Sequence, residues 1–331
     1  MFYELLKDIK TLSVIGMCKN AGKTTVLNTL ISECEAAGEI LGLTSIGRDG
    51  ERSDLVTNTH KPEIFVGRGA VIATAEGLLK EGDVSREILD ATGIPTPMGE
   101  IVIVRAASSG FVQLGGASIT EQQKLIRDKL IDLGCTRVFI DGAISRKSLG
   151  TPALCDGVIL SSGASYDPDI SLTAEDTAFI AKLFSLPVDR KAAEHMGLAR
   201  YTAVHEGEAH TADDINALVP VLKAGAELMI MRGAVTDSTA AALTAVGKLL
   251  RNTLLVAEDA SRLLLKAANY EKLMRFTRGF EVMKGTKLIA VTVNPFSAYG
   301  LHYDKKEFGD RVREALERAR VTVPVMDVKD A

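Results

Sequence analysis

The segment from Leu12 to Thr25 constrains the fold of this chain more than any other part of the sequence. It begins with a short apolar run, Leu12–Ile15, which predicts a buried strand. It ends in Gly22-Lys23-Thr24-Thr25, where spaced apolar residues predict the start of a helix. A loop between a strand and a helix gathers backbone N–H groups with the free N–H groups of the first helical turn. Strand, loop and helix in this order therefore predict a binding site for phosphate.

The glycine spacing differs by one residue from the phosphate-loop pattern G-x-x-x-x-G-K-[ST]. Counting back from Gly22, the first glycine belongs at position 17, which is Met17, whereas Gly16 lies one place earlier. Either the loop contains one additional residue, or Met17 takes the first position with a different turn. An ordinary strand-to-helix turn is the alternative. Because Gly-Lys-Thr-Thr directly follows a predicted strand, we interpret the segment as a nucleotide-binding loop.

Lys23 and Thr24 have the side-chain chemistry expected of such a loop. The ammonium group of Lys23 suits the β- and γ-phosphates of a nucleotide, and the Thr24 hydroxyl suits Mg²⁺. The residues expected to bind the nucleotide, ATP or GTP, are Lys19, Asn20, Ala21, Gly22, Lys23, Thr24 and Thr25. Cys18 lies in the same loop, where N–H groups and Lys23 would lower its thiol pKa, unless it is a small apolar filler.

Acidic residues after two further predicted strands are candidates for the catalytic centre. Residues 137–141 form an apolar strand that ends in Asp141 and is followed by glycine, the position where a P-loop fold holds Mg²⁺ or its water. The loop after the predicted strand 40–46 contains Asp49, Glu51 and Asp54. We expect Lys23, Asp141 and Asp49 to be catalytic, and Thr24, Asp141 and Asp54 to hold the metal. Strand-end turn residues and solvated loop acids are the alternatives.

Alternating strands and helices predict an α/β protein with two domains. Predicted strands lie at residues 12–15, 40–46, 101–104, 137–141, 157–165, 228–231, 253–257, 288–293 and 323–328. Predicted helices lie at residues 23–37, 84–91, 120–133, 172–184, 213–223, 238–249, 260–267 and 305–319. We expect a nucleotide-binding domain with a mostly parallel sheet at residues 1–188. A second α/β domain for an effector or partner is expected at residues 200–331, unless some later strands extend the first sheet.

Polar residues also follow several strands of the second half. They are Arg232–Asp237, Glu258 with Asp259, and Asn294 with Pro295. Ligands bind open α/β sheets at the carboxyl ends of their strands, so these residues are candidates for a second site. Polar strand ends are common to all α/β domains, and that alternative stays open.

Composition restricts the compartment and the class of partner. The net charge of −4 over 331 residues gives no reason to expect a nucleic acid or membrane partner. No apolar run approaches the ~20 residues that span a bilayer. The 4 cysteines form no C-x-x-C pair, which argues against a disulfide framework and a zinc site. The first residues lack the features of a signal peptide, so we expect a cytoplasmic protein.

Residues 1–185 resemble the signalling-type P-loop NTPases, which include the molybdopterin-guanine dinucleotide accessory protein and dethiobiotin synthetase. The segment Lys19-Asn-Ala-Gly-Lys-Thr-Thr25 is similar to the loop of the accessory protein. The resemblance to the synthetase implies that Lys23 binds the phosphates, that Thr24 binds Mg²⁺, and that Asp49 or Asp54 supplies the acid after the second strand. A site for the diamino acid substrate of the synthetase is not apparent, so that reaction is not carried over.

Over its full length the chain resembles a bacterial family associated with amino-acid fermentation, the reactivase subunit of lysine 5,6-aminomutase. The segments that are similar are Gly16–Thr24, Thr44–Glu51, Gly233–Asp237 and Thr292–Pro295. This resemblance implies ATP-driven exchange of damaged cobalamin on the aminomutase, together with a second ATPase subunit.

The sequence therefore predicts a Mg²⁺-dependent NTPase, with ATP favoured over GTP, that couples hydrolysis to the reactivation or remodelling of a partner enzyme. A small-molecule kinase or ligase and a nucleotide-binding scaffold without turnover are the alternatives. No residue pattern distinguishes adenine from guanine, and none sets the oligomeric state.

Overall fold

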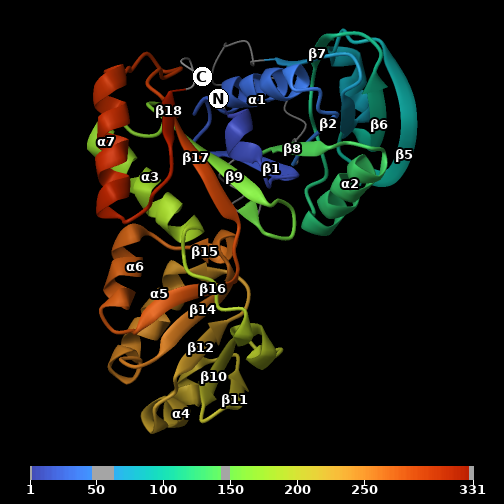
Figure 1. Ribbon diagram of the computed structural model, residues 1–331. Helices are drawn as coiled ribbons and strands as arrows, with labels where there is room; N and C mark the ends of the chain where they lie inside the picture. The colour runs from blue at the N-terminus through green and yellow to red at the C-terminus, as the bar shows by residue number, and fades with distance from the viewer. Residues whose placement is uncertain (1, 47–62, 143–149, 328–331) are drawn as a thin grey trace. The chain divides into compact units, whose positions relative to one another are not determined.

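A nine-stranded sheet lies in the larger of two compact units in this chain (Figure 1). The structure is a computed structural model that describes residues 2–46, 63–142 and 150–327. The larger unit comprises residues 1–178 and 287–331, and the smaller unit comprises residues 179–286.

The large sheet is mostly parallel, which confirms the predicted α/β class. Its strands lie in the order β18 (Val325–Asp327), β17 (Lys287–Asn294), β9 (Gly157–Gly163), β1 (Thr11–Gly16), β8 (Arg137–Asp141), β2 (Leu41–Ser45), β4 (Val71–Ala75), β6 (Gly99–Ala106) and β5 (Arg86–Thr96). All neighbours from β18 to β4 pair in parallel. The strand β6 pairs antiparallel with both β4 and β5.

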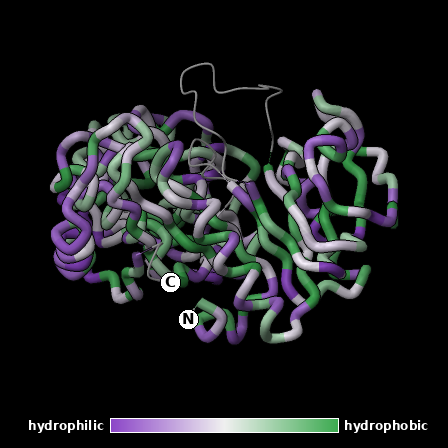
Figure 2. Tube along the Cα trace, turned by 90° about the horizontal axis from the view of Figure 1, so that it is seen from above, coloured by the Kyte–Doolittle hydropathy of each residue, from purple (hydrophilic) through white to green (hydrophobic). Residues whose placement is uncertain are grey.

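Both faces of this sheet are covered. Helix α1 (Lys23–Ala36) packs on one face, and its apolar residues form a cluster with residues of the strands, including Val26, Leu30, Leu12, Val14, Leu43, Phe139 and Ile159. Helix α2 (Thr120–Asp132) covers the other face, where a Cβ atom at Gly42 would lie 3.2 Å from Leu130 Cβ. Strand β1 is therefore buried at every position, as expected for a central parallel strand. Figure 2 shows such hydrophobic stretches inside and hydrophilic residues along outer turns.

A two-stranded ribbon lies outside the large sheet in the same unit. It is formed by β3 (Ile64–Val66) and β7 (Gly110–Val112), which pair antiparallel. The side-chain amide of Asn28 in α1 donates to Glu63 O at 3.0 Å and accepts from Phe65 N at 3.1 Å. The Asn28 side-chain amide thus attaches the ribbon to α1 by satisfying one backbone C=O and one backbone N–H, as a neighbouring strand would.

The smaller unit contains a five-stranded sheet. Its order is β11 (Glu208–Ala212), β10 (Tyr201–His205), β12 (Leu228–Met231), β14 (Leu254–Asp259) and β16 (Gly279–Lys284). The last three strands are parallel, and β10 is antiparallel to both of its neighbours. Helices α4 (Val219–Ala224), α5 (Asp237–Ala245) and α6 (Ala267–Met274) and a short pair, β13 (Val235–Thr236) with β15 (Leu263–Leu264), complete this unit.

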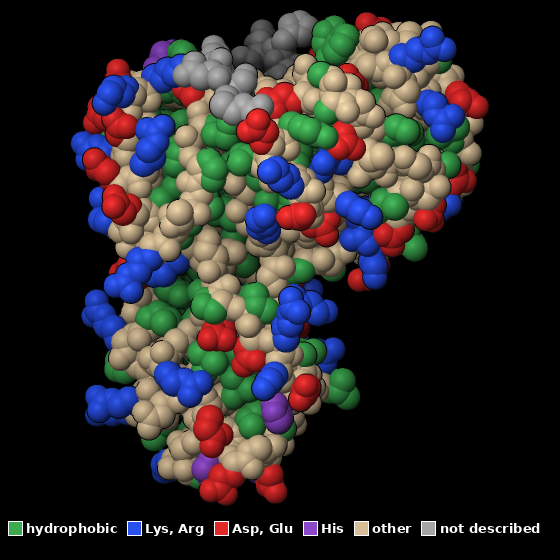
Figure 3. All heavy atoms as spheres, viewed as in Figure 1, with side chains coloured by type: hydrophobic (Ala, Val, Ile, Leu, Met, Phe, Trp, Pro, Cys, Tyr) green, Lys and Arg blue, Asp and Glu red, His purple; other side chains and the backbone are tan. Residues whose placement is uncertain are grey.

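Two longer helices complete the description. Helix α3 (Ile170–Phe184) spans the boundary between the two units in the sequence, and α7 (Lys305–Arg318) belongs to the larger unit. Figure 3 shows both charge signs interspersed over the α7 surface, where Lys306 pairs with Asp310 at 2.7 Å.

Among the residues that the structure describes, no helix combines the length and apolar character that crossing a membrane requires. Short 3-10 helices lie at Tyr3–Leu6, Glu76–Glu81, Lys191–His195, Ile215–Leu218, Gly247–Leu249 and Ala260–Arg262.

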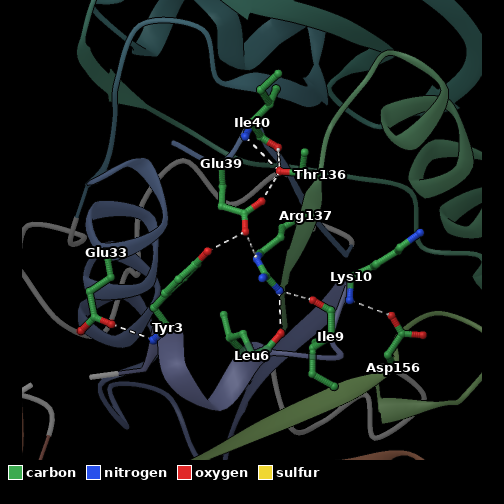
Figure 4. Close-up of polar contacts among 10 residues, drawn as sticks. All are labelled: Tyr3, Leu6, Ile9, Lys10, Glu33, Glu39, Ile40, Thr136, Arg137 and Asp156. Atoms are coloured by element: carbon green, nitrogen blue, oxygen red, sulfur yellow. Dashed lines mark hydrogen bonds and ion pairs between the residues drawn. The ribbon is translucent and has the colours of Figure 1, made fainter. Parts of the chain in front are cut away.

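A polar network around Arg137 ties the N-terminal segment to the amino end of β8 (Figure 4). Arg137 donates to Leu6 O at 2.7 Å and to Glu39 Oε1 at 2.9 Å, and its guanidinium lies 5.3 Å from the centre of the Tyr3 ring. Desolvation would raise the pKa of Glu39, but hydrogen bonds from Thr136, Arg137 and Tyr3 outweigh it and lower that pKa. At this end of the sheet, the polar groups of these residues are hydrogen-bonded to one another.

The domain boundaries differ from the predicted division into residues 1–188 and 200–331. Strands β17 and β18 join the large sheet, so the chain leaves that sheet, forms the smaller unit and returns. Of the two arrangements that the sequence left open, the structure has the extended first sheet. An apolar run such as residues 288–293 fits any buried parallel strand, and only tertiary pairing selects the sheet to which it belongs.

Two predicted helices are wrong. Residues 84–91 contribute to the edge strand β5, because hydrogen bonds to β6 across the turn at residues 97–98 decide their conformation. Residues 260–267 form a 3-10 turn and β15 instead of a helix, and α6 begins at Ala267. In both cases the apolar segment is short, and a short apolar segment fits a helix or a strand equally well.

Candidate functional site

The β1–α1 loop (residues 17–22) follows the carboxyl end of β1, at the edge of the sheet where open α/β folds bind ligands. Two of its residues have left-handed backbone conformations, Asn20 with a φ of 61° and Gly22 with a φ of 92°. Gly22 is the N-cap residue of α1, and no side chain caps that helix. The loop therefore turns into a helix whose first N–H groups have no side-chain partner.

Backbone donors in this loop are largely unused within the described parts of the chain. The N–H groups of Cys18, Asn20, Ala21 and Gly22 donate no hydrogen bond there. The first N–H of α1 that bonds back is that of Val26, which donates at 3.1 Å to the preceding turn. Successive free N–H groups in a turn bind anions, and the partial positive charge of a helix N-terminus adds to the attraction. The loop can therefore accept a phosphate group.

Lys23 lies against the backbone of the loop. A Cβ atom at Gly16 would come within 2.8 Å of Lys23 Cδ, and Lys23 Nζ donates to Cys18 O at 3.3 Å. Met17 is only 5% exposed, and its N–H donates to Ser161 O at 2.7 Å. Gly16 thus occupies the position under the lysine, and the geometry agrees with a loop that has one additional residue.

The other predicted nucleotide ligands have different exposures. Thr24 is partly buried in the first turn of α1. Thr25 and Lys19 are exposed, and Ala21 is fully buried. Thr24 and Lys23 can therefore contribute side chains, whereas Ala21 has no exposed surface.

Asp141 lies on the same face of the sheet as Lys23. It pairs in register with Val14 of β1 and with Ser45 of β2, and side chains in register share a face of a parallel sheet. Gly16 is two residues beyond Val14 and also lies on that face, directly under Lys23. The Asp141 carboxylate and the Lys23 ammonium are therefore on one side of the sheet at its carboxyl edge.

A magnesium site would use few protein ligands here. Mg²⁺ commonly binds through one or two protein oxygens together with phosphate and water, and of the predicted ligands Thr24 carries a hydroxyl and Asp141 a carboxylate. In the described ranges, no group of three or more His, Cys, Asp or Glu residues could hold a metal ion by itself. Asp49, Glu51 and Asp54 lie outside the described residues.

The carboxyl ends of β9 and β17 lie beside the β1–α1 loop and contact it. A Cβ atom at Gly163 would lie 3.0 Å from Ala21 Cα, so the two backbones are in close contact. On the other strand, Asn294 Nδ2 donates to Asn20 O at 3.0 Å. The loops that follow these strands are joined by a 3.2 Å hydrogen bond from Ser165 to Ser297. The loop conformation is therefore fixed by residues far away in the sequence.

The thiol pKa of Cys18 is raised in the structure and not lowered. Burial raises the pKa of its thiol to about 11, although the neighbouring charge of Lys23 lowers it. The proposed lowering of this pKa is therefore wrong, because desolvation outweighs the charge of the lysine. Cys18 acts through its backbone carbonyl, which accepts the hydrogen bond from Lys23.

The strand-end residues proposed as a second site lie in different sheets. Gly233 N donates to Glu258 Oε1 at 2.9 Å, so the ends of β12 and β14 do meet in the smaller unit. Asp237 accepts from Lys266 N at 2.9 Å, and Asp259 accepts from Ser261 N at 2.8 Å. Both acids therefore accept hydrogen bonds from backbone N–H groups of the smaller unit. Asn294 instead lies at the end of β17 in the large sheet.

The sequence pattern marks Asn294 only as a polar strand end. It carries no information on the neighbouring strand, so it links neither Asn294 nor Ser161 to the β1–α1 loop. No protein-family model, curated protein or solved structure matches this chain.

Proposed function

We propose that this chain binds a nucleoside triphosphate with Mg²⁺ at the β1–α1 loop and hydrolyses it, coupling hydrolysis to the state of a protein partner. One observation carries the proposal. Within the described residues, the N–H groups of Cys18, Asn20 and Gly22 donate no hydrogen bond, and they lie in one turn with the ammonium of Lys23 against it. That set of donors suits the β- and γ-phosphates of a nucleotide.

Each residue has a distinct role in this proposal. Lys23 binds the β- and γ-phosphate oxygens, and Thr24 and Asp141 hold Mg²⁺, which neutralises charge between those phosphates. The acid that positions the attacking water comes from Asp49 or Asp54. The preference for ATP over GTP and the partner, a cobalamin-dependent aminomutase with or without a second ATPase subunit, rest on the sequence resemblance alone.

The proposal is tested with radiolabelled ATP and GTP in the presence and absence of Mg²⁺. Lys23→Ala removes a charge-assisted hydrogen bond, so we expect nucleotide affinity to fall about tenfold to a hundredfold. The matched control is Lys124→Ala, which removes an exposed lysine of α2 and should leave affinity unchanged. Equal affinity of wild type and Lys23→Ala would refute the site.

Turnover separates the proposed activity from other uses of the same loop. Phosphate release that rises when an aminomutase is added, and disappears in Lys23→Ala, supports coupling to a partner. ADP formation that needs a small-molecule acceptor would indicate a kinase or ligase. Tight nucleotide binding without turnover, whether an aminomutase or a small-molecule acceptor is added, would indicate a scaffold.

A further inference from the structure

Asn294 contacts three separate segments at the carboxyl edge of the large sheet. Its side-chain Nδ2 donates to Asn20 O at 3.0 Å, and its Oδ1 accepts from Phe296 N at 3.2 Å. Its backbone oxygen accepts from Ala164 N at 2.9 Å, in the loop after β9. One partly buried asparagine at the end of β17 thus joins the β1–α1 loop to both neighbouring loops.

The hydrogen bond to Asn20 acts on the peptide that follows it. In a trans peptide the C=O of Asn20 and the N–H of Ala21 point in opposite directions from one rigid plane. No cis peptide bond occurs in the described chain. A donor that fixes the Asn20 oxygen therefore also fixes the Ala21 N–H on the opposite side of that plane, away from Asn294.

The need for such a contact follows from the backbone of the loop. Asn20 adopts a φ of 61°, a left-handed conformation whose cost is smaller for asparagine than for most other non-glycine residues. On the other side, the close approach of Gly163 to Ala21 leaves the loop little room to relax. An external hydrogen bond at Asn20 offsets part of this cost and selects one orientation of the peptide.

We propose that Asn294 is a positioning residue that fixes the Asn20–Ala21 peptide and thereby holds the β1–α1 loop in the conformation that binds phosphate. This inference rests on the proposed nucleotide site, which it deepens. Because β17 begins at Lys287, where the chain returns from the smaller unit, the positioning contact lies on a strand connected directly to that unit in the sequence. Binding at the loop thereby depends on a residue 274 positions away.

The test is Asn294→Asp. An aspartate keeps an oxygen that accepts from Phe296 N and keeps the backbone bond to Ala164, but it cannot donate to Asn20 O. We expect Kd for the Mg²⁺-triphosphate to rise about threefold to tenfold or more, with affinity for the free nucleoside unchanged. The control is Asn252→Asp, an exposed position in the smaller unit. Equal triphosphate affinity in wild type and Asn294→Asp would overturn the proposal.

A second readout does not require nucleotide. Lys19 is exposed in the loop, so tryptic cleavage after it reports local opening. Without ligand, we expect cleavage about threefold to tenfold faster in Asn294→Asp than in wild type, with an unchanged melting temperature. Unchanged cleavage would overturn the positioning role. If wild type binds no triphosphate while cleavage still accelerates, the nucleotide proposal fails and the control of the loop by Asn294 stands.

Discussion

The side chain of Lys23 lies directly over Gly16, so that a Cβ atom at that glycine would meet Lys23 Cδ at 2.8 Å and Lys23 Nζ at 3.1 Å. The glycine and the lysine are the two ends of the turn that connects β1 to α1. Their contact explains why glycine at position 16, although outside the usual spacing, is compatible with a phosphate-binding loop.

Gly16→Ala should therefore impair nucleotide binding more than folding. The new methyl group displaces a flexible lysine side chain, which moves at low cost, so we expect the free energy of unfolding to change by less than about 1 kcal/mol. Loss of the lysine contact to phosphate should weaken nucleotide binding about tenfold or more. Chemical denaturation and isothermal titration calorimetry measure the two effects. If Gly16→Ala bound nucleotide with wild-type affinity, binding would not depend on the position of the Lys23 side chain.

Asp141→Asn should separate binding of the metal from binding of the nucleotide. Asp141 lies on the same sheet face as Lys23, and the proposed function assigns its carboxylate to Mg²⁺. We expect the Mg²⁺ concentration for half-maximal activity to rise about tenfold or more, with nucleotide affinity in EDTA unchanged. An unaltered Mg²⁺ dependence would remove Asp141 from the site.

Arg137→Ala should destabilise the fold without touching the candidate site. Arg137 is 12% exposed and bonds Glu39 and two backbone oxygens of the N-terminal segment. Removing it leaves the Glu39 carboxylate with only its Thr136 and Tyr3 donors and takes one donor from each of two backbone oxygens, which should cost about 1–3 kcal/mol in the free energy of unfolding. Arg105→Ala is the matched control, because Arg105 and Glu87 form an exposed pair with 42% and 64% exposure. That control should cost about 0–1 kcal/mol, and equal losses would refute the argument.

The pH dependence of stability should include a contribution from Glu39. Its pKa is lower in the folded chain than in the unfolded chain, because hydrogen bonds to the ionised form outweigh desolvation. The unfolded state therefore binds its proton first as the pH falls. Stability from Glu39 is full above the ordinary glutamate pKa and is lost as the pH falls through the lower, folded value.

Glu39→Gln isolates this contribution. The variant should be less stable at pH 7, and its stability should fall less steeply than that of wild type as the pH decreases below about 4.3. Denaturation curves measured across the acid range test the difference in slope. Parallel curves for the two proteins would show that Glu39 titrates equally in both states.

The local parts of the candidate site could be predicted from the sequence. A strand, a glycine-containing turn and a helix start are set by neighbouring residues, so β1, the β1–α1 loop and α1 lie where the pattern predicts them. The same holds for the strand that ends in Asp141, because a buried apolar run followed by Asp-Gly defines its own end. Hydrophobic periodicity was sufficient for the α/β class.

Only the tertiary structure decided which strands surround the loop. A parallel strand shows the same apolar run whichever sheet it joins. The assignment of β17 to the large sheet depends on its pairing with β9, more than a hundred positions away, and β18 joins the sheet by pairing with β17. The conformation of β5 likewise depends on its hydrogen bonds to β6. The sequence thus determined the donors of the β1–α1 loop, whereas long-range backbone pairing brought Asn294 and Ser161 to hold them in place.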